Sequence, residues 1–481
     1  MEPFALIIFG ITSNLSQIKL IPALYDMEEK GFLPKDMSII GNARKPMSRE
    51  EIQKFVFEVL QKENKHHKHE IKEDMFKRLS QRFYYIDGHL DDPDFYPRLK
   101  DFLKKKTKMG TPCNNLIFYL ATYPELYHHI FKNLHSVGLN IEKNGFVRLM
   151  IEKPIGHDLK SAKELNSLLH KYFKEDQIYR LDHYLGKDTL QNILTFRFGN
   201  GVFEPVINKD FVDHIQITAT EDFGIGGRGG YYDQVGALKD VGQNHQLQML
   251  AFTTMDAPHE FSNNAVTRRR IEILKHLKPL PDKIVFGQYQ GYKKEPNVDP
   301  HSNIETFYAY KTYIENERFK NVPIYVRAGK KLNQTVTEIS IVFKNPVNRL
   351  FNDMKIGNEP NVLIYRIQPN EGIVLKMLVK KPGPGFELEP NYMQYCYKLD
   401  PKTELPDPYE KLLLDAISGN QTFFNDAEEV EAQWAFIDPL SEAKKKVTEY
   451  EPGSWGPKEA DELIKADGRQ WLEPSMLFCR I

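Results

Sequence analysis

The chain has 481 residues, of which 41% are hydrophobic and 27% are charged, and its formal net charge is −1. This composition is typical of a globular protein and excludes a disordered chain, while the balanced charge excludes a general attraction to nucleic acid. The length exceeds that of one ordinary hydrophobic core, so we expect two domains.

Apolar runs and cysteines indicate the compartment. The longest apolar runs, such as residues 4–9, are far shorter than the ~20 residues that span a bilayer, and the N-terminus lacks a signal-peptide pattern. Cys113, Cys396 and Cys479 are widely spaced and odd in number, which indicates neither a disulfide framework nor a zinc site. We therefore expect a cytoplasmic protein that binds no metal, no membrane and no nucleic acid.

The N-terminal residues predict the start of a dinucleotide-binding fold. Residues 4–9 form an apolar run, as in a strand buried on both faces of a parallel sheet. A turn follows at Gly10, and residues 17–29 have helical spacing, so that a helix N-terminus is offered to a pyrophosphate. A second strand at residues 37–41 leads to Arg44, where such folds accommodate the 2′-phosphate of NADP.

Further strands and helices continue this α/β pattern. Strands are predicted at residues 116–122 and 146–151, and amphipathic helices at residues 51–62, 71–82 and 158–174. The strand at 146–151 ends before Lys153, which places this lysine in the ligand crevice of an open α/β sheet. His66, His67 and His69 form a histidine cluster, which we interpret as part of a solvated linker rather than a metal site.

The segment Arg180-Leu181-Asp182-His183-Tyr184-Leu185-Gly186-Lys187-Asp188 holds two cations, two carboxylates, an imidazole and a phenol. Its Tyr-Leu-Gly run can form a turn that brings His183 and Lys187 around one anion, and this pair suits a phosphate. Asp182 can orient another histidine and stabilise it when charged. The alternative interpretation is a solvated, salt-bridged loop.

The second half of the chain has the pattern of an antiparallel sheet. Residues 215–221 alternate with period two, as in a strand with one exposed face. Residues 226–230 are interpreted as a flexible glycine-rich turn, residues 231–255 as one long helix, and residues after about 452 as peripheral. Alternating strands at 307–313, 339–343, 363–367 and 373–379 follow without long helices between them, which predicts an α+β domain.

The nine-residue segment at 180–188 resembles the signature R-I-D-H-Y-L-G-K-E of the glucose-6-phosphate dehydrogenase family, with Leu181 and Asp188 as conservative replacements. Residues 152–156, 226–231 and 240–245 match further segments of that family in the same order. The resemblance implies an α/β Rossmann-type domain at residues 1–181. It implies an α+β domain with a large, mainly antiparallel sheet for substrate binding and dimerisation at residues 182–481.

The same resemblance implies an activity: oxidation of D-glucose 6-phosphate to 6-phosphoglucono-1,5-lactone with NADP, the first step of the oxidative pentose phosphate pathway. It makes His245 the general base, a role that suits an imidazole at neutral pH, and Asp182 its carboxylate partner. The implied substrate-binding residues are Lys153, His183, Tyr184, Lys187, Glu221, Asp240, Lys330 and Gln368. The implied cofactor-binding residues are Gly10, Thr12, Ser13, Asn14, Leu15, Arg44 and Lys153. A homodimer or tetramer is also implied.

The chain departs from the family pattern in its first turn and near Lys330. The usual G-x-x-G-D-L-A turn has Ser13 for its second glycine and Asn14 for its aspartate, and Gln17 and Ile18 replace residues that are often basic. Thr335 replaces a basic residue that commonly contacts substrate. Two alternatives stay open: another NADP-dependent sugar oxidoreductase, or a weakly active homologue that serves as a binding or regulatory subunit.

Overall fold

The computed structural model describes residues 2–67, 71–108, 114–143, 145–345, 359–397, 405–443, 446–475 and 478–479. The side chains of His66 and His67 and all of His69 lie outside this description, as does Cys113. The chain forms two units, described separately below. The first unit comprises Met1–Gly156, Lys160–Gly186 and Pro406–Ala427, and the second comprises His157–Leu159, Lys187–Leu405 and Glu428–Ile481. The domain boundary predicted after residue 181 stays a prediction.

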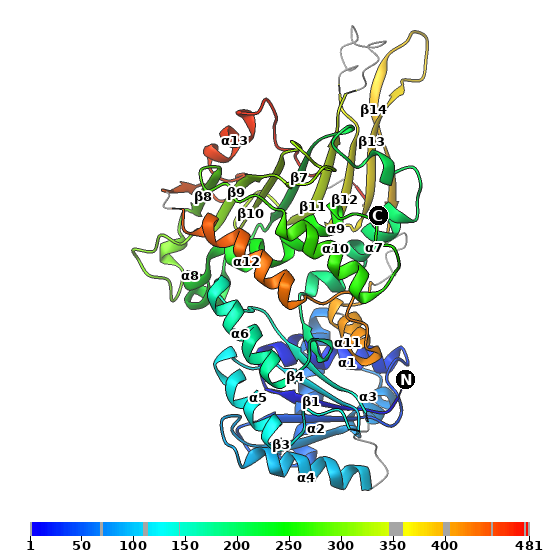
Figure 1. Ribbon diagram of the computed structural model, residues 1–481, viewed down its shortest axis with the longest axis vertical. Coiled ribbons are helices and arrows are strands. Elements are labelled where there is room, and N and C mark those ends of the chain that lie inside the picture. Colours follow the sequence, from blue (N-terminus) through cyan, green and yellow to red (C-terminus); the bar gives the residue numbers. More distant parts are fainter. Residues whose placement is uncertain are drawn as a thin grey trace. The chain divides into compact units, whose positions relative to one another are not determined.

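The first unit is built on a parallel six-stranded sheet with the order β3-β2-β1-β4-β5-β6 (Figure 1). The strands are β1 (Ala5–Phe9), β2 (Ser38–Ala43), β3 (Phe83–Asp87), β4 (Leu116–Leu120), β5 (Val147–Ile151) and β6 (Ile178–Arg180). This is the strand order of dinucleotide-binding folds, in which the order reverses between β1 and β4 and ligands bind beside the carboxyl ends of the strands. The predicted Rossmann-type domain is confirmed.

Helices connect these strands, and one of them comes from far along the chain. The helices are the π-helix η1 (Ser16–Leu20), α1 (Ile21–Glu29), α2 (Arg49–His67), α3 (Glu73–Ser80), α4 (Phe95–Lys108), α5 (Tyr127–Ser136), α6 (Leu159–Tyr172) and α11 (Pro408–Ser418). Helix α11 begins with a capping box between Asp407 and Glu410. Arg148 on β5 donates to the carbonyls of Ala416 and Ile417, each at 2.6 Å, which holds the other end of α11. The sequence analysis did not predict that this helix belongs to the first unit.

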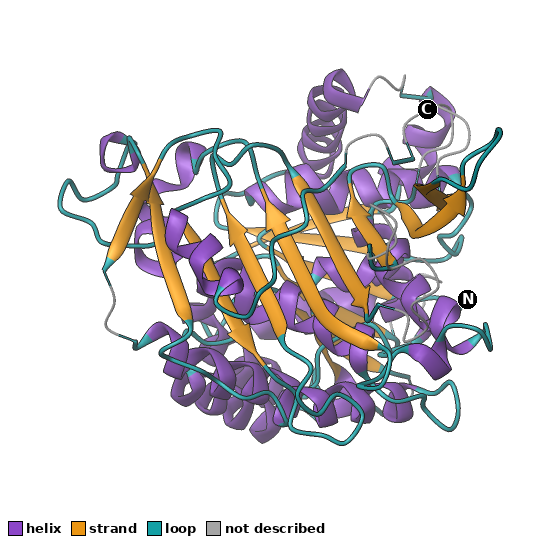
Figure 2. Cartoon of the chain, turned by 90° about the horizontal axis from the view of Figure 1, so that it is seen from above, coloured by secondary structure: helices purple, strands orange, loops and turns teal. Residues whose placement is uncertain are grey.

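The second unit is built on a nine-stranded mixed sheet with the order β14-β13-β12-β11-β7-β10-β9-β8-β15 (Figure 2). Among the described strands only the pairs β7–β10 and β8–β15 are parallel, which confirms the predicted, mainly antiparallel sheet. The strands are β7 (Val212–Thr220), β8 (Ile284–Tyr289), β9 (Phe307–Thr312), β10 (Ile324–Gly329), β11 (Val336–Phe343), β12 (Val362–Gln368), β13 (Gly372–Lys380), β14 (Leu388–Cys396) and β15 (Val447–Tyr450). Strands β13 and β14 form the long yellow hairpin of Figure 1.

The helices of the second unit lie before, between and after its strands along the chain. They are α7 (Asp188–Phe198), α8 (Gly229–Ala237), the π-helix η7 (Leu238–Gln246), α9 (Leu247–Thr254), α10 (Asn263–Lys275), α12 (Ala427–Ser441) and α13 (Lys458–Lys465). Short 3₁₀ turns are η2 (Pro124–Leu126), η3 (Glu175–Gln177) and η4 (His183–Gly186) in the first unit, and η5 (Glu204–Val206), η6 (Gly226–Arg228) and η8 (Tyr292–Lys294) in the second. No helix among the described residues is long and apolar enough to cross a membrane.

The polar face of β7 is buried, which corrects the prediction of an exposed face. Gln216 and Thr218 are 2% and 3% exposed, because Gln216 meets the segment after α13 and Thr218 accepts a hydrogen bond from Arg327. The Gln216 amide donates to the carbonyl of Gln470, and its oxygen accepts from the N–H of Leu472, each at 2.9 Å. Period-two alternation therefore identified the strand but not what covers its polar face.

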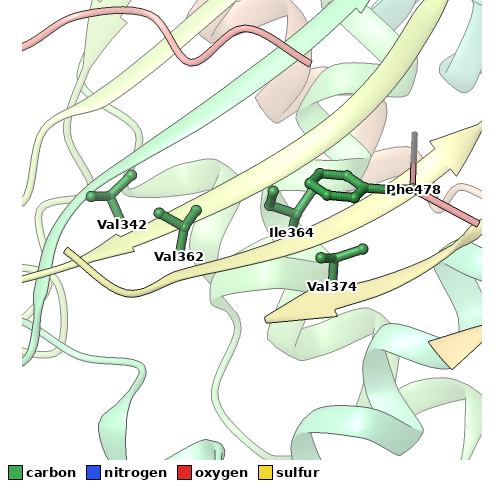
Figure 3. Close-up of a cluster of buried hydrophobic side chains, with 5 residues drawn as sticks. All are labelled: Val342, Val362, Ile364, Val374 and Phe478. Carbon is green, nitrogen blue, oxygen red and sulfur yellow. The ribbon is translucent and has the colours of Figure 1, made fainter. Parts of the chain in front are cut away.

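The residues after 452 are not peripheral as predicted, because they pack on the large sheet. Phe478 lies beside Ile364 in a buried hydrophobic cluster that also contains Val342, Val362 and Val374, from β11, β12 and β13 (Figure 3). Cys479 forms a disulfide with Cys396 at the end of β14, 83 residues away. The expectation of no disulfide is wrong for this pair, because the tail brings together two cysteines that are distant in the sequence.

Candidate functional site

In the first unit, the turn after β1 presents the start of a helix at the carboxyl end of the parallel sheet. Gly10 has a φ of +90°, and a Cβ atom there would lie 2.3 Å from the backbone oxygen of Ala121, so only glycine fits. Thr12, Asn14 and Leu15 complete the turn, and helical structure begins at Asn14. The predicted anion-binding helix N-terminus is therefore placed where a dinucleotide fold uses it.

The residues that depart from the family pattern form hydrogen bonds within this turn. The Ser13 hydroxyl oxygen accepts from the N–H of Ser16 at 3.2 Å, and the Ser16 hydroxyl donates to the carbonyl of Gly10 at 2.9 Å. The Gln17 amide donates to the carbonyl of Thr12 at 2.9 Å. Ser13 and Gln17 thus replace a tight glycine turn with one that side-chain hydrogen bonds hold together.

Arg44 follows β2 directly and is exposed. Lys19, a second basic residue near the turn, forms an ion pair with Asp407 at 3.0 Å, and its ammonium lies 6.0 Å from the centre of the Tyr409 ring. Lys19 is therefore engaged at the start of α11. Arg44 has no ion-pair partner within the described part of the chain, so its guanidinium is available to an anion.

Lys153 lies two residues after β5, and the Lys153–Pro154 peptide bond is cis. Its neighbour Glu152 accepts a hydrogen bond from the Tyr119 hydroxyl. The pKa of Glu152 is raised to about 7: burial and the nearby Asp182 carboxylate raise it, while Tyr119, Lys153 and Tyr409 partly oppose the shift. The sequence analysis did not single out Glu152, although a charged residue at the end of a buried strand is a visible signal.

In the segment at 180–188, Arg180 has a structural role, and the polar residues that follow it lie in a turn. Arg180 is fully buried, and its guanidinium donates to both carboxylate oxygens of Glu175, at 2.5 and 3.1 Å. Asp182 is 1% exposed and accepts from the N–H of Tyr184 at 3.0 Å, which fixes the 3₁₀ turn that carries His183. The solvated-loop interpretation is wrong for Arg180 and Asp182, because both are buried.

The chain passes from the first unit to the second between Gly186 and Lys187. Gly186 is packed so closely that a Cβ atom would lie 2.6 Å from the carbonyl oxygen of Pro408. Lys187 stands at the N-terminal boundary of α7. The predicted phosphate-binding residues are thus divided, with His183 and Tyr184 in the first unit and Lys187 in the second.

In the second unit, three predicted residues lie at the same end of three inner strands of the nine-stranded sheet. Strands β7, β10 and β12 run in the same direction, because β7 is parallel to β10 and both β7 and β12 are antiparallel to β11. Glu221, Lys330 and Gln368 stand at their carboxyl ends. Lys330 is 7% exposed and forms an ion pair with Glu221.

Thr335 lies at the same end of the sheet, because it comes just before β11, which runs antiparallel to β7. Its hydroxyl donates to the carboxylate of Asp222 at 2.5 Å and accepts from the N–H of Asp222 at 3.0 Å. Thr335 thus holds the turn after β7 instead of offering a positive charge.

The helix that carries Asp240 and His245 is not the single long helix predicted. Gly236 has a φ of 74° and a ψ of 169°, which separates α8 from the π-helix η7. Residues five apart are linked by the backbone hydrogen bonds of a π-helix and lie nearer to one face of it, whereas in an α-helix they are turned about 140° apart. The π-helix therefore brings Asp240 and His245 toward one face, and both are buried, at 7% and 3% exposure.

Glu305 holds the start of this π-helix. Its carboxylate accepts from the N–H of Leu238 at 3.1 Å, and its backbone carbonyl accepts from the N–H of Ala237 at 3.0 Å. Burial raises the pKa of Glu305 to about 7. A Cβ atom on Gly236 would lie 2.4 Å from this carboxylate, so the break in the helix and the carboxylate depend on each other.

Each unit thus presents part of a chemically coherent set. The first unit offers a dinucleotide turn, an exposed arginine, Lys153 and the Asp182–Tyr184 turn. The second offers a buried imidazole on a π-helix and a group of charged and amide side chains at the carboxyl ends of three strands. Carboxylates, amides and lysines suit a polyhydroxylated, anionic substrate, and a buried imidazole suits proton transfer near neutral pH.

Comparisons with known proteins agree over nearly the full length. The family profile described as the glucose-6-phosphate dehydrogenase NAD binding domain matches residues 7–192, and that of the C-terminal domain matches residues 194–472. The glucose-6-phosphate 1-dehydrogenase of Chlamydia muridarum is 39% identical, with 98% of this chain and 96% of that protein covered. The Treponema pallidum enzyme is 38% identical, with 99% and 96% covered.

Solved structures agree with these matches. The crystal structure of glucose-6-phosphate 1-dehydrogenase from Mycobacterium avium is similar with a TM-score of 0.88 and 32% identity, covering 98% of this chain and 99% of that one. A glucose-6-phosphate dehydrogenase in complex with glucose 6-phosphate is similar with a TM-score of 0.89 and 32% identity, covering 98% of both chains.

We predict that Gly236→Ala destabilises the second unit. The substitution forces a side chain into the left-handed region and against Glu305, which together cost on the order of 1–3 kcal/mol. Thermal unfolding followed by circular dichroism should show a lower Tm. Gly230→Ala in the same helix α8 is the control, since its Cβ atom would meet nothing closer than 3.8 Å, at the Cβ of Asn297. Equal melting temperatures for the two variants would contradict the role assigned to Gly236.

Proposed function

The chain belongs to the glucose-6-phosphate dehydrogenase family, and from this premise we propose which residues carry its reaction. Its activity is that of a glucose-6-phosphate 1-dehydrogenase, an oxidoreductase of the pentose phosphate pathway. The carrying observation is that both family domains match in order and that curated enzymes are similar over 98–99% of the chain. The reaction oxidises the C1 hydroxyl of glucose 6-phosphate to a lactone.

The proposed base is His245, with Asp182 as its carboxylate partner. Oxidation at C1 removes a proton from the hydroxyl and a hydride from the carbon, and bound NADP supplies the hydride acceptor. His245 is 3% exposed, and an imidazole in such a site can take the hydroxyl proton near neutral pH. Asp182 would accept from the second ring N–H and stabilise the imidazolium that forms.

The proposed substrate contacts follow from charge. His183, Tyr184 and Lys187 would bind the 6-phosphate through charge-assisted hydrogen bonds. Asp240 and Glu221 would accept hydrogen bonds from sugar hydroxyls. The remaining proposed contacts are Lys153, Lys330 and Gln368. One support is that Glu221, Lys330 and Gln368 lie at the carboxyl ends of three strands of one sheet. Another is that Asp182 fixes the turn that carries His183.

Purified protein should reduce NADP in the presence of glucose 6-phosphate and far less with free glucose, as measured by absorbance of the reduced nicotinamide. His245→Ala should lower kcat by roughly 10²- to 10⁴-fold while calorimetry shows retained binding of glucose 6-phosphate. Asp182→Asn should act on the same step, so the loss in the double variant should be less than additive. Wild-type turnover in His245→Ala would refute the base assignment. Binding of glucose 6-phosphate without reduction of either nucleotide would favour the weakly active homologue.

The proposed cofactor is NADP in preference to NAD. Arg44 stands after β2, where a 2′-phosphate would lie, and its planar guanidinium can bind a phosphate through two hydrogen bonds. Gly10, Thr12, Ser13, Asn14 and Leu15 would approach the pyrophosphate, with Lys153 near the nicotinamide. Gln17 and Ile18 replace residues that often add positive charge near this pocket, so the preference is expected to be modest.

Arg44→Ala should weaken NADP by roughly tenfold or more, which corresponds to about 1.5 kcal/mol, and leave NAD almost unchanged. The reason is that only NADP carries the phosphate that this guanidinium contacts. The ratio of kcat/KM for the two cofactors, measured in wild type and variant, tests this. An unchanged ratio would assign the 2′-phosphate to Lys45, since Lys19 is engaged by Asp407.

The proposed assembly is a dimer, alone or paired into a tetramer, formed through the sheet of the second unit. Strand β14 is an edge strand and exposes Met393 and Tyr395 at 63% and 54%. An unpaired edge with large apolar side chains is a surface that a second copy can cover. The proposed compartment is the cytoplasm, where a disulfide such as Cys396–Cys479 is unusual.

Light scattering on the purified protein should give twice or four times the mass of one chain. Met393→Lys should shift the mass toward that of one chain, because the interface would bury an unpaired charge. Phe261→Lys is the control, because Phe261 is also exposed, at 72%, but lies outside the sheet. A single-chain mass for the wild type, or equal masses for both variants, would contradict this interface.

A further inference from the structure

A carboxylate with no role in the reaction above lies directly before Lys153. The carboxylate of Glu152 accepts from the hydroxyl of Tyr119 on β4 and is also hydrogen-bonded to the hydroxyl of Tyr409 on α11. The backbone of Glu152 is hydrogen-bonded to Tyr127 at the start of α5. The three tyrosines are 0%, 7% and 1% exposed in this order, so buried hydroxyls from three elements of the first unit meet Glu152, two at its carboxylate and one at its backbone.

The charges around Glu152 favour neither ionisation state strongly. Burial raises its pKa to about 7, and the Asp182 carboxylate raises it as well. The hydrogen bond from Tyr119, the charge of Lys153 and the hydrogen bond from Tyr409 lower it. The phenols of Tyr119, Tyr127 and Tyr409 have pKa values raised by burial, so they stay protonated as donors. Glu152 is therefore the group of this cluster that titrates near neutral pH.

Tyr409 is a fixed partner because α11 is held at both ends. Asp407 caps α11 by accepting from the N–H of Tyr409 at 2.8 Å and pairs with Lys19 at 3.0 Å. Lys30 pairs with Glu410 at 2.5 Å, and the other end of α11 is bonded to Arg148. The hydroxyl of Tyr409 is thus held in place relative to the strand end at Glu152.

The same tyrosine meets a second substrate residue. The Tyr409 ring is stacked with the ring of His183, with centroids 6.4 Å apart and planes 14° from parallel. Glu152 is thus connected to both Lys153, its neighbour along the chain, and His183, through Tyr409. These are substrate residues of the first unit in the proposed function.

We propose that Glu152 is a positioning residue whose ionised form holds the strand end that carries Lys153 in its substrate-binding arrangement. An ionised carboxylate accepts from two tyrosine hydroxyls and attracts the Lys153 ammonium. A protonated carboxyl carries its own O–H, so a tyrosine hydroxyl that donates to the carboxylate must turn to accept instead, and the charge that attracts Lys153 is lost. The inference rests on the proposed function, because it takes the substrate role of Lys153 from there.

The direction in which the KM should change with pH follows from the ionisation of Glu152. Above the pKa of about 7 Glu152 is charged and Lys153 is held, so the KM for glucose 6-phosphate should be lower than below it. Glu152→Gln resembles the protonated form at every pH. Its KM should exceed that of wild type about five- to tenfold at about pH 8 and match it at about pH 6, with kcat little changed. Ionisation of the substrate phosphate also falls in this range, but it affects both proteins equally and cancels in the ratio.

A second variant keeps the test decisive if Glu152→Gln folds poorly. Tyr119→Phe removes a hydrogen bond that favours the charged carboxylate, so the transition in KM should move to higher pH. Tyr127→Phe is the matched control, because its hydroxyl meets the backbone of Glu152 rather than the carboxylate. That variant should keep the wild-type transition.

Steady-state kinetics and calorimetric binding of glucose 6-phosphate, both measured across this pH range, are the experiments. A wild-type KM for Glu152→Gln at about pH 8, or an unmoved transition in Tyr119→Phe, would overturn the proposal. An inactive wild type would refute the proposed function instead. An active wild type whose KM ratio to Glu152→Gln is constant with pH would refute only the role of Glu152.

Discussion

Buried arginines paired with carboxylates hold the segments that carry the candidate site. Arg270 on α10 and Glu429 on α12 are both fully buried and 2.8 Å apart, and Glu429 also accepts from Gln248 at 3.3 Å. Gln248 lies three residues after His245, so this group fixes the helix that continues from the π-helix. Removing one partner of such a pair leaves an isolated buried charge at a cost of about 3–5 kcal/mol, which makes these positions intolerant of change.

Equivalent pairs act elsewhere in each unit. Arg180 with Glu175 starts the segment that contains Asp182 and His183, and Arg366 with Glu338 joins β12 to β11 near Gln368. These pairs use guanidinium groups, which offer several donors in a plane and are hard to deprotonate. Carboxylates that lack an arginine partner behave differently. Glu152 and Glu305 are held by neutral donors, and burial raises the pKa of each to about 7.

The departures of this chain from its family are local substitutions that the structure accommodates. Ser13 and Gln17 satisfy the first turn with side-chain hydrogen bonds, and Thr335 satisfies the turn after β7 through Asp222. In each case the side chain is used to hold a turn. The expected consequence is a change in affinity with the same chemistry, because His245, Asp182 and Lys153 are all present.

The sequence by itself determined those features of the protein that depend only on residues close together along the chain. Period two identified β7, β9, β11, β12 and β13, apolar runs identified β1, β4 and β5, and the segment at 180–188 identified the family. These signals are local, because side-chain chemistry and backbone period repeat within a few residues. Only the tertiary structure decided that α11 joins the first unit, that the terminal segment buries the polar face of β7, and that Gly236 starts a π-helix. It alone placed Tyr119 and Tyr409 on Glu152, since burial and pKa depend on contacts between residues hundreds of positions apart.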